Sequence, residues 1–154
     1  MKIFYPALLA LLLAACNAGD NADNSGRDSV VLTSDNIPAE RKNVSPRPIK
    51  SYAETVKSFE TTDEFKVGLY ETKETFIYLI KISYKQMNVN DTLHVPNFGM
   101  EPAVEIVKGD SIRPSCIVGF LDKDKQFREL KLIAFKHDRL KVKVLKHYAV
   151  YQNE

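Results

Sequence analysis

Residues 76–85 read Phe-Ile-Tyr-Leu-Ile-Lys-Ile-Ser-Tyr-Lys, and one side of this run is uniformly apolar. Large apolar side chains occupy every second position, at Phe76, Tyr78, Ile80, Ile82 and Tyr84. Lys81 and Ser83 occupy the positions between Ile80, Ile82 and Tyr84. Alternation with a period of two is typical of a β-strand that buries one face. The run therefore predicts a long strand with one side in a protein core.

The same pattern continues on both sides of this run. It predicts further strands at 65–70, 92–95, 103–108, 111–121, 127–136 and 140–151. Turns are expected at 71–73, 88–91, 109–110, 122–125 and 137–138, most of them rich in Asn, Asp or Gly. Pro114 predicts an edge or a bulge in the first half of its strand. About seven strands with short connections predict an all-β fold, either a small antiparallel β-sandwich or a partly open barrel.

Residues 51–60 have a different pattern. Ser51 and Glu54 have the spacing of a capping box. Tyr52, Val56 and Phe59 follow at intervals that place them on one face of a helix. We therefore expect one short helix before the strands.

The chain between residues 17 and 49 contains no aromatic residue and is rich in Asn, Asp, Ser and Pro. Such a segment buries too little apolar surface to offset its conformational entropy. We expect residues 16–49 to form a flexible tether with a mean reach of about 30 Å. The folded domain is then expected at 50–154.

The N-terminal residues form a secretory signal by their composition. Lys2 precedes an apolar stretch, which ends in Leu13-Ala14-Ala15-Cys16. A basic start, an apolar segment of roughly ten residues and small residues at the end are typical of such signals. The apolar stretch falls short of the ~20 residues that a membrane-spanning helix needs.

This ending resembles the lipobox of bacterial lipoproteins, in which the cysteine receives a diacylglyceryl group and becomes the first residue of the mature protein. The resemblance implies that residues 1–15 are removed and that Cys16 is lipidated. Two or more acyl chains hold a protein firmly on a membrane without a spanning helix. Asn17 stands where lipoproteins retained at the inner membrane often carry Asp. The resemblance therefore implies an envelope protein, on the outer rather than the inner membrane.

The sequence contains no motif that predicts catalysis. The formal net charge of +2 argues against nucleic-acid binding. No Gly-rich phosphate loop or G-x-S-x-G motif is present, and His94, His137 and His147 lack the spacing of metal ligands. Cys116 lies in an apolar run, which predicts a buried thiol. We expect a protein that is not an enzyme and that uses no cofactor or metal.

Two features are candidates for partner binding. Phe98 and Met100 lie in the proline-bracketed loop 96–102, where they either plug one end of the core or contact a partner. Lys141 and Lys143 belong to residues 121–154, which hold nine Lys or Arg against five acids. These lysines are either a solvated, edge-protecting face or a docking surface for an acidic partner.

Together these features predict a non-enzymatic envelope lipoprotein that acts as a binding or assembly module for an envelope protein partner. The alternative is a surface-displayed small-ligand binder or inhibitor with an apolar cavity in its sandwich or barrel. Nothing in the sequence indicates an oligomeric state.

Overall fold

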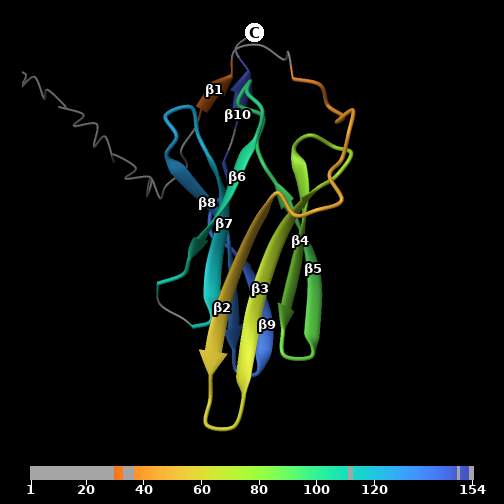
Figure 1. Cartoon of the computed structure of the whole chain (residues 1–154). Helices are drawn as coiled ribbons and strands as arrows, with labels where there is room; N and C mark the ends of the chain where they lie inside the picture. The colour runs from red at the N-terminus through yellow and green to blue at the C-terminus, as the bar shows by residue number, and fades with distance from the viewer. Residues whose placement is uncertain (1–29, 33–36, 111–112, 149, 153–154) are drawn as a thin grey trace, which may run out of the picture.

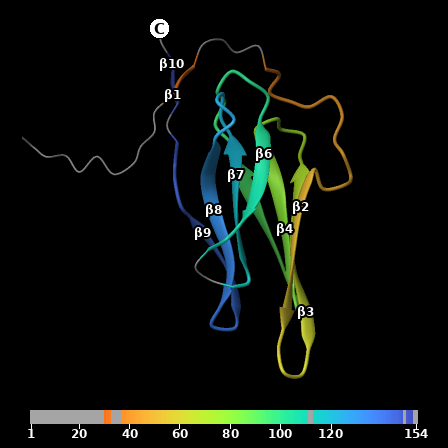
Figure 2. The ribbon, with the colours of Figure 1, turned by 60° about the vertical axis from the view of Figure 1, so that its left-hand side comes forward.

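The computed structural model describes residues 30–32, 37–110, 113–148 and 150–152, and within these ranges the regular structure is entirely β-strand. Two four-stranded antiparallel sheets pack face to face (Figures 1 and 2). The first consists of β2 (Lys50–Lys57), β3 (Thr62–Glu71), β4 (Ile77–Tyr84) and β5 (Met87–His94). The second consists of β6 (Ala103–Lys108), β7 (Ser115–Leu121), β8 (Phe127–Lys136) and β9 (Arg139–Val144). No ladder joins the two open sheets in the described ranges, so the prediction of a β-sandwich is confirmed.

Each sheet is a meander in which every strand pairs with the next one along the chain. The loop 95–102 carries the chain from β5 in the first sheet to β6 in the second. A separate short parallel ladder joins β1 (Val30–Leu32) to β10 (Val150–Gln152). Short hairpin connections account for the agreement between chain order and strand order.

The core lies between the sheets and is filled by the inward-facing residues of the central strands. These buried side chains include Phe65, Val67, Leu69, Tyr78, Ile80, Ile82, Cys116, Val118, Phe120 and Ile133. The alternation of buried and exposed positions in β3 and β4 follows from the pleat of a strand, which turns successive side chains to opposite faces. The period-two pattern of 76–85 thus predicts both the strand and its buried side.

The predicted helix at 51–60 is wrong, because residues 50–57 form the edge strand β2. Tyr52 and Val56 pack against the core from one face of this strand, and Glu54 lies between them. The Tyr52 hydroxyl donates to Glu54 Oε2 at 2.9 Å, so the expected capping glutamate serves as an acceptor between the sheets. An interval of four residues fits both a helix face and a strand face, which explains the error.

The predicted turn at 88–91 is also wrong. Its residues lie inside β5, and the chain turns instead at Lys85, whose φ is 54°. Asn88 and Asn90 are exposed on this edge strand, while Val89 packs against the core. A polar outer face explains the turn-like composition of these residues.

The last predicted strand is shorter than expected, because the β8–β9 ladder ends at Val144. Leu145 N still donates to Leu130 O at 2.8 Å, and Tyr148 packs against the core beyond the ladder. Of the predicted strand 111–121, residues 115–121 form β7, and 111–112 lie outside the described residues.

A β-bulge shapes the second sheet. Its register shifts between Val118 and Gly119, which makes Leu130 the extra residue of β8. Lys131 therefore turns toward the first sheet, where its Nζ lies 2.7 Å from Asp91 Oδ2 and donates to Thr92 O. This ion pair closes the side of the sandwich where β5 faces β8. On the other side, Lys50 Nζ lies 2.6 Å from Glu105 Oε2 and joins β2 to β6.

Candidate functional site

The two candidates in the loop 95–102 lie against the core. Phe98 is 5% exposed, and its ring stacks on Phe120 with a centroid distance of 5.0 Å. Tyr148 packs edge-on against the other side of Phe120 at 5.4 Å. Met100 is partly buried and packs against the same core. These positions fit the interpretation of the loop as a plug, and Phe98 offers almost no surface to a partner.

The two lysine candidates are exposed on the edge strand β9. Lys141 pairs with Ala134 and Lys143 with Leu132 across the β8–β9 ladder. Among the described residues, neither lysine forms an ion pair. The four candidates therefore do not form one site: Phe98 and Met100 belong to a loop between the sheets, whereas the lysines belong to a sheet edge.

The lysines of β9 border an apolar surface that the sequence patterns did not reveal. One cross-strand row runs through Val107, Ile117, Leu132 and Lys143. Directly opposed residues of an antiparallel ladder share a face. Since Cys116 and Val118 point into the core, the intervening Ile117 and its row point outward. Val107, Ile117 and Leu132 are partly exposed there.

Neighbouring rows extend this surface. Leu121 opposes Phe127 in one row, and Ala134 opposes Lys141 in another. We call the whole surface the β6–β9 outer face, formed by Val107, Ile117, Leu121, Phe127, Leu132, Arg139, Lys141 and Lys143. The rows through Ile117 and Leu121 are apolar, the row between them carries Glu105 and Glu129, and the β9 edge is basic.

The outer face of the first sheet carries fewer large apolar side chains, which are Tyr70, Leu79 and Ile77 at one end of the sheet. One of its cross-strand rows runs through Ala53, Lys66, Ser83 and Asn88. The contrast between the two outer faces identifies the second sheet as the better binding surface. The sequence does contain a signal for this apolar outer face. In β7 and β8, apolar residues occupy both the odd and the even positions, which indicates strands with two apolar faces.

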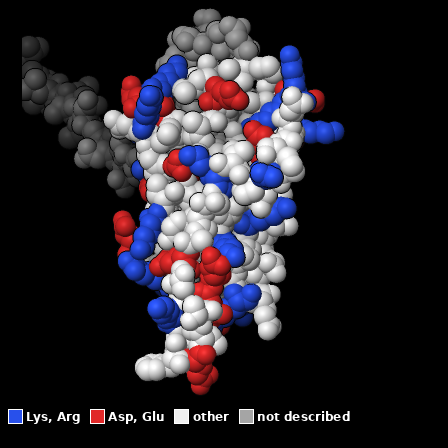
Figure 3. Space-filling view, viewed as in Figure 1, with Lys and Arg blue, Asp and Glu red and all other residues white. Residues whose placement is uncertain are grey.

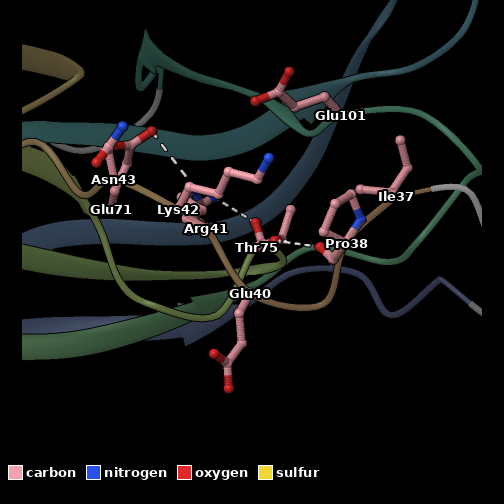
Figure 4. Close-up of a pocket in the computed structure, with 9 residues that line it drawn as sticks. All are labelled: Ile37, Pro38, Glu40, Arg41, Lys42, Asn43, Glu71, Thr75 and Glu101. Carbon is pink, nitrogen blue, oxygen red and sulfur yellow. Dashed lines mark hydrogen bonds and ion pairs between the residues drawn. The ribbon is translucent and has the colours of Figure 1, made fainter.

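A hollow of about 290 Å³ lies where residues 37–43 cross the connection between β3 and β4 (Figure 4). Its lining includes Pro38, Lys42, Thr75 and Glu101. The Thr75 hydroxyl donates to Pro38 O at 2.6 Å. The backbones of Glu40 and Glu74 form an isolated antiparallel β-bridge. Residues 37–49, which the composition assigns to the tether, thus include a segment that is bonded to the sandwich.

Arg41 is the main anchor of that segment. Its guanidinium donates to the carbonyl oxygens of Thr72 at 2.9 Å and Glu74 at 2.5 Å, and also to that of Thr75. The same group lies 4.5 Å from the centre of the Tyr78 ring, and its side chain is only 8% exposed. Because these donors are already used within the chain, Arg41 serves as a structural anchor in this hollow.

The described residues contain no set of groups suited to metal or thiolate chemistry. No cluster of three or more His, Cys, Asp or Glu side chains is placed to hold a metal ion in the ranges that the structure covers. Cys116 is fully buried, which confirms the prediction of a core thiol. Burial, with a smaller effect of the nearby Glu54 carboxylate, raises the pKa of this thiol to about 12. Its nucleophilic thiolate is therefore not populated near neutral pH.

Cys16 and the signal sequence 1–15 lie outside the described residues. Among the residues that are described, we find no helix with the length and apolar character required to cross a bilayer. The chain matches no model of a known protein family, no curated protein and no solved structure. The function is therefore inferred from the chain's own residues.

Proposed function

We propose that this chain is a lipid-anchored envelope lipoprotein whose β-sandwich is a non-enzymatic binding module. The Leu13-Ala14-Ala15-Cys16 motif supports lipidation at Cys16, and Asn17 supports the outer membrane. A lipid anchor confines the module to one surface and so raises its effective concentration near an envelope partner.

The observation that carries this proposal is the composition of the β6–β9 outer face. Burial of its half-exposed Ile117, Leu132 and Phe127 by a partner would remove apolar surface from water. Lys141 and Lys143 at its edge have no acidic neighbour bonded to them among the described residues. Exposed apolar rows with charged residues beside them resemble the anatomy of a protein interface. The partner is therefore expected to carry an apolar patch with acidic residues beside it.

The test is affinity purification of the full-length lipidated protein after mild crosslinking in cells. We expect a near-stoichiometric envelope protein that is lost from the Cys16→Ala variant and from the double variant Lys141→Glu/Lys143→Glu. The control Lys66→Glu/Lys81→Glu reverses two charges on the outer face of the other sheet and should retain the partner. If Lys141→Glu/Lys143→Glu retains the partner, the β6–β9 outer face is not the binding surface.

The alternative is a surface-displayed binder of a small ligand or an inhibitor. The hollow beside Arg41 is one candidate place for such a ligand, and its volume of about 290 Å³ is just below the usual range of ligand pockets. The bonds from Arg41 to Thr72, Glu74 and Thr75 make it less suited to ligand recognition. We therefore favour the protein-binding module.

A further inference from the structure

The tip of the β2–β3 hairpin projects beyond the ends of the neighbouring strands (Figures 1 and 2). The ladder continues to the pair Lys57–Thr62, so only residues 58–61 form the turn. Ser58 N donates to Thr61 O at 2.9 Å, and Thr61 N donates to Ser58 Oγ at 3.1 Å. The Thr61 hydroxyl donates to Asp63 Oδ2 at 2.9 Å. These bonds hold the turn in a defined shape before any partner binds.

Phe59 occupies this turn and is fully exposed, with a relative exposure of 111%. The other large apolar side chains exposed by more than a third in the described ranges are Val44, Ile49 and Val144, at 37–44%. Turn positions favour Gly, Asn, Asp, Pro and Ser, each for a backbone reason that Phe does not share. Phe59 contributes nothing to the core, and the rigid, projecting turn presents its ring to solvent.

The charges around the tip indicate what kind of partner this is. The hairpin end carries Glu60, Asp63 and Glu64. The nearby cations are Lys57, the Glu64-bound Lys66, and Lys85, which lines a hollow together with Thr61 and Asp63. Figure 3 shows acidic side chains at the lower end of the molecule, where this hairpin projects. Anionic membrane surfaces attract basic segments, so an acidic tip is unsuited to them. A protein pocket with apolar walls and a basic rim complements both the ring and the carboxylates.

We propose that Phe59 is an anchor residue that inserts into an apolar pocket with a basic rim on the protein partner of the module. This inference rests on the proposed function, since it names a second contact of the same tethered module. The rigid turn lowers the entropic cost of presenting the ring, as in other preorganised contacts. The occupant is a protein and not a bilayer.

The first experiment places a photo-crosslinking phenylalanine analogue at position 59 of the full-length lipidated protein in cells. Ala53, exposed on the outer face of the same hairpin, is the control position. We expect irradiation to link position 59 to one protein, with the linked peptide found next to Lys or Arg residues, and to give no such product from position 53. Products with phospholipid alone, or no protein product from position 59, would overturn the inference.

The second experiment measures the affinity of that purified partner for Phe59 variants. Phe59→Ser should weaken binding at least about tenfold, and Phe59→Leu should weaken it less. Glu60→Lys should also weaken binding, because it reverses a charge that faces the basic rim. Unchanged affinity of Phe59→Ser would overturn the inference. Since the Phe59 ring packs on nothing, the urea unfolding midpoint of Phe59→Ser should match that of the unmodified protein. This measurement separates lost binding from lost folding.

The two proposals fail in different ways. If Lys141→Glu/Lys143→Glu loses the partner while Phe59→Ser retains it, the tip plays no part and the β6–β9 outer face stands. If Phe59→Ser loses the partner while the lysine variant retains it, Phe59 is a contact and the β6–β9 outer face is not. If no protein associates with any form, both proposals are wrong.

Discussion

Replacement of Arg41 by Ala should destabilise the whole sandwich, although Arg41 lies in a segment whose composition predicts a tether. The change removes the donors to the carbonyl oxygens of Thr72, Glu74 and Thr75 at the end of the first sheet. It also removes the cation from the face of the Tyr78 ring.

The magnitude follows from the number and kind of these bonds. A hydrogen bond from a charged donor contributes about 1.5–3 kcal/mol net, and water can reach part of this site. The ion pair with Glu71, at 3.6 Å and partly exposed, adds at most about 1 kcal/mol. Since bonds that share one group are not additive, we expect a loss of about 3 kcal/mol. That is a large part of the 5–15 kcal/mol typical of a domain.

Urea unfolding followed by tyrosine fluorescence or circular dichroism measures this loss. With a slope of about 2 kcal/mol/M, the midpoint should fall by about 1.5 M. Lys42→Ala is the matched control, because Lys42 is the exposed neighbour in the same segment and should change stability by less than about 0.5 kcal/mol. A loss below about 1 kcal/mol for Arg41→Ala would refute the conclusion that this segment belongs to the folded unit.

Three further predictions concern the second sheet. Gly119→Ala should cost about 2–3 kcal/mol in urea unfolding, because its Cβ would lie 2.0 Å from the backbone oxygen of Arg128. The control Gly68→Ala in the first sheet should cost less than half as much, because its Cβ would meet the movable Tyr70 ring at 3.0 Å and Pro48 Cβ at 3.5 Å. The Cys116 thiol, whose pKa burial raises to about 12, should react with a disulfide reagent at pH 8 only as fast as the domain unfolds. Burial opposes ionisation of Asp122, but hydrogen bonds from Gln126 N and Arg128 outweigh it and lower the pKa of this carboxyl, so its contribution to stability is full above about pH 4 and declines as acid protonates it.

Each of these has a result that would contradict it. Equal losses for the two glycine variants would mean that the bulge tolerates a side chain. Rapid labelling of Cys116 in urea-free buffer would show that the core opens readily at β7. The Asp122→Asn variant should lose less stability than the unmodified protein as the pH falls from 4 to 2, and parallel pH curves would remove Asp122 from the acid response.

β3 and β4 could be predicted because one parity alone is apolar, whereas β7 and β8, which are apolar at both parities, could be bounded by the polar turns 122–125 and 137–138. The alternation through Tyr78, Ile80 and Ile82 predicts β4, and Gly109 ends the strand that is β6. β2 was missed because Tyr52 and Val56 satisfy two periods at once, and tertiary packing decides between them. Residues 50–57 form a strand because they pair with β3 at the edge of the sheet, and no local sequence pattern encodes that pairing.

The site was less predictable than the fold for a related reason. Lys141 and Lys143 could be identified from charge alone, but their apolar neighbours Ile117 and Leu132 come from other strands and meet only through sheet register. Arg41 was missed because its partners are backbone carbonyl oxygens, which leave no trace in the identity of residues 72–75. Phe59 was assigned to the apolar face of the expected helix, whereas the hairpin turns it into solvent.

We propose that a lipid-anchored module docks on an envelope protein through the β6–β9 outer face. The most direct test is quantitative mass spectrometry of crosslinked complexes purified from cells with the full-length protein, Cys16→Ala and Lys141→Glu/Lys143→Glu. We expect one envelope protein near stoichiometry with the full-length protein and its loss from both variants. Recovery of the same protein at the same level with either variant would contradict it.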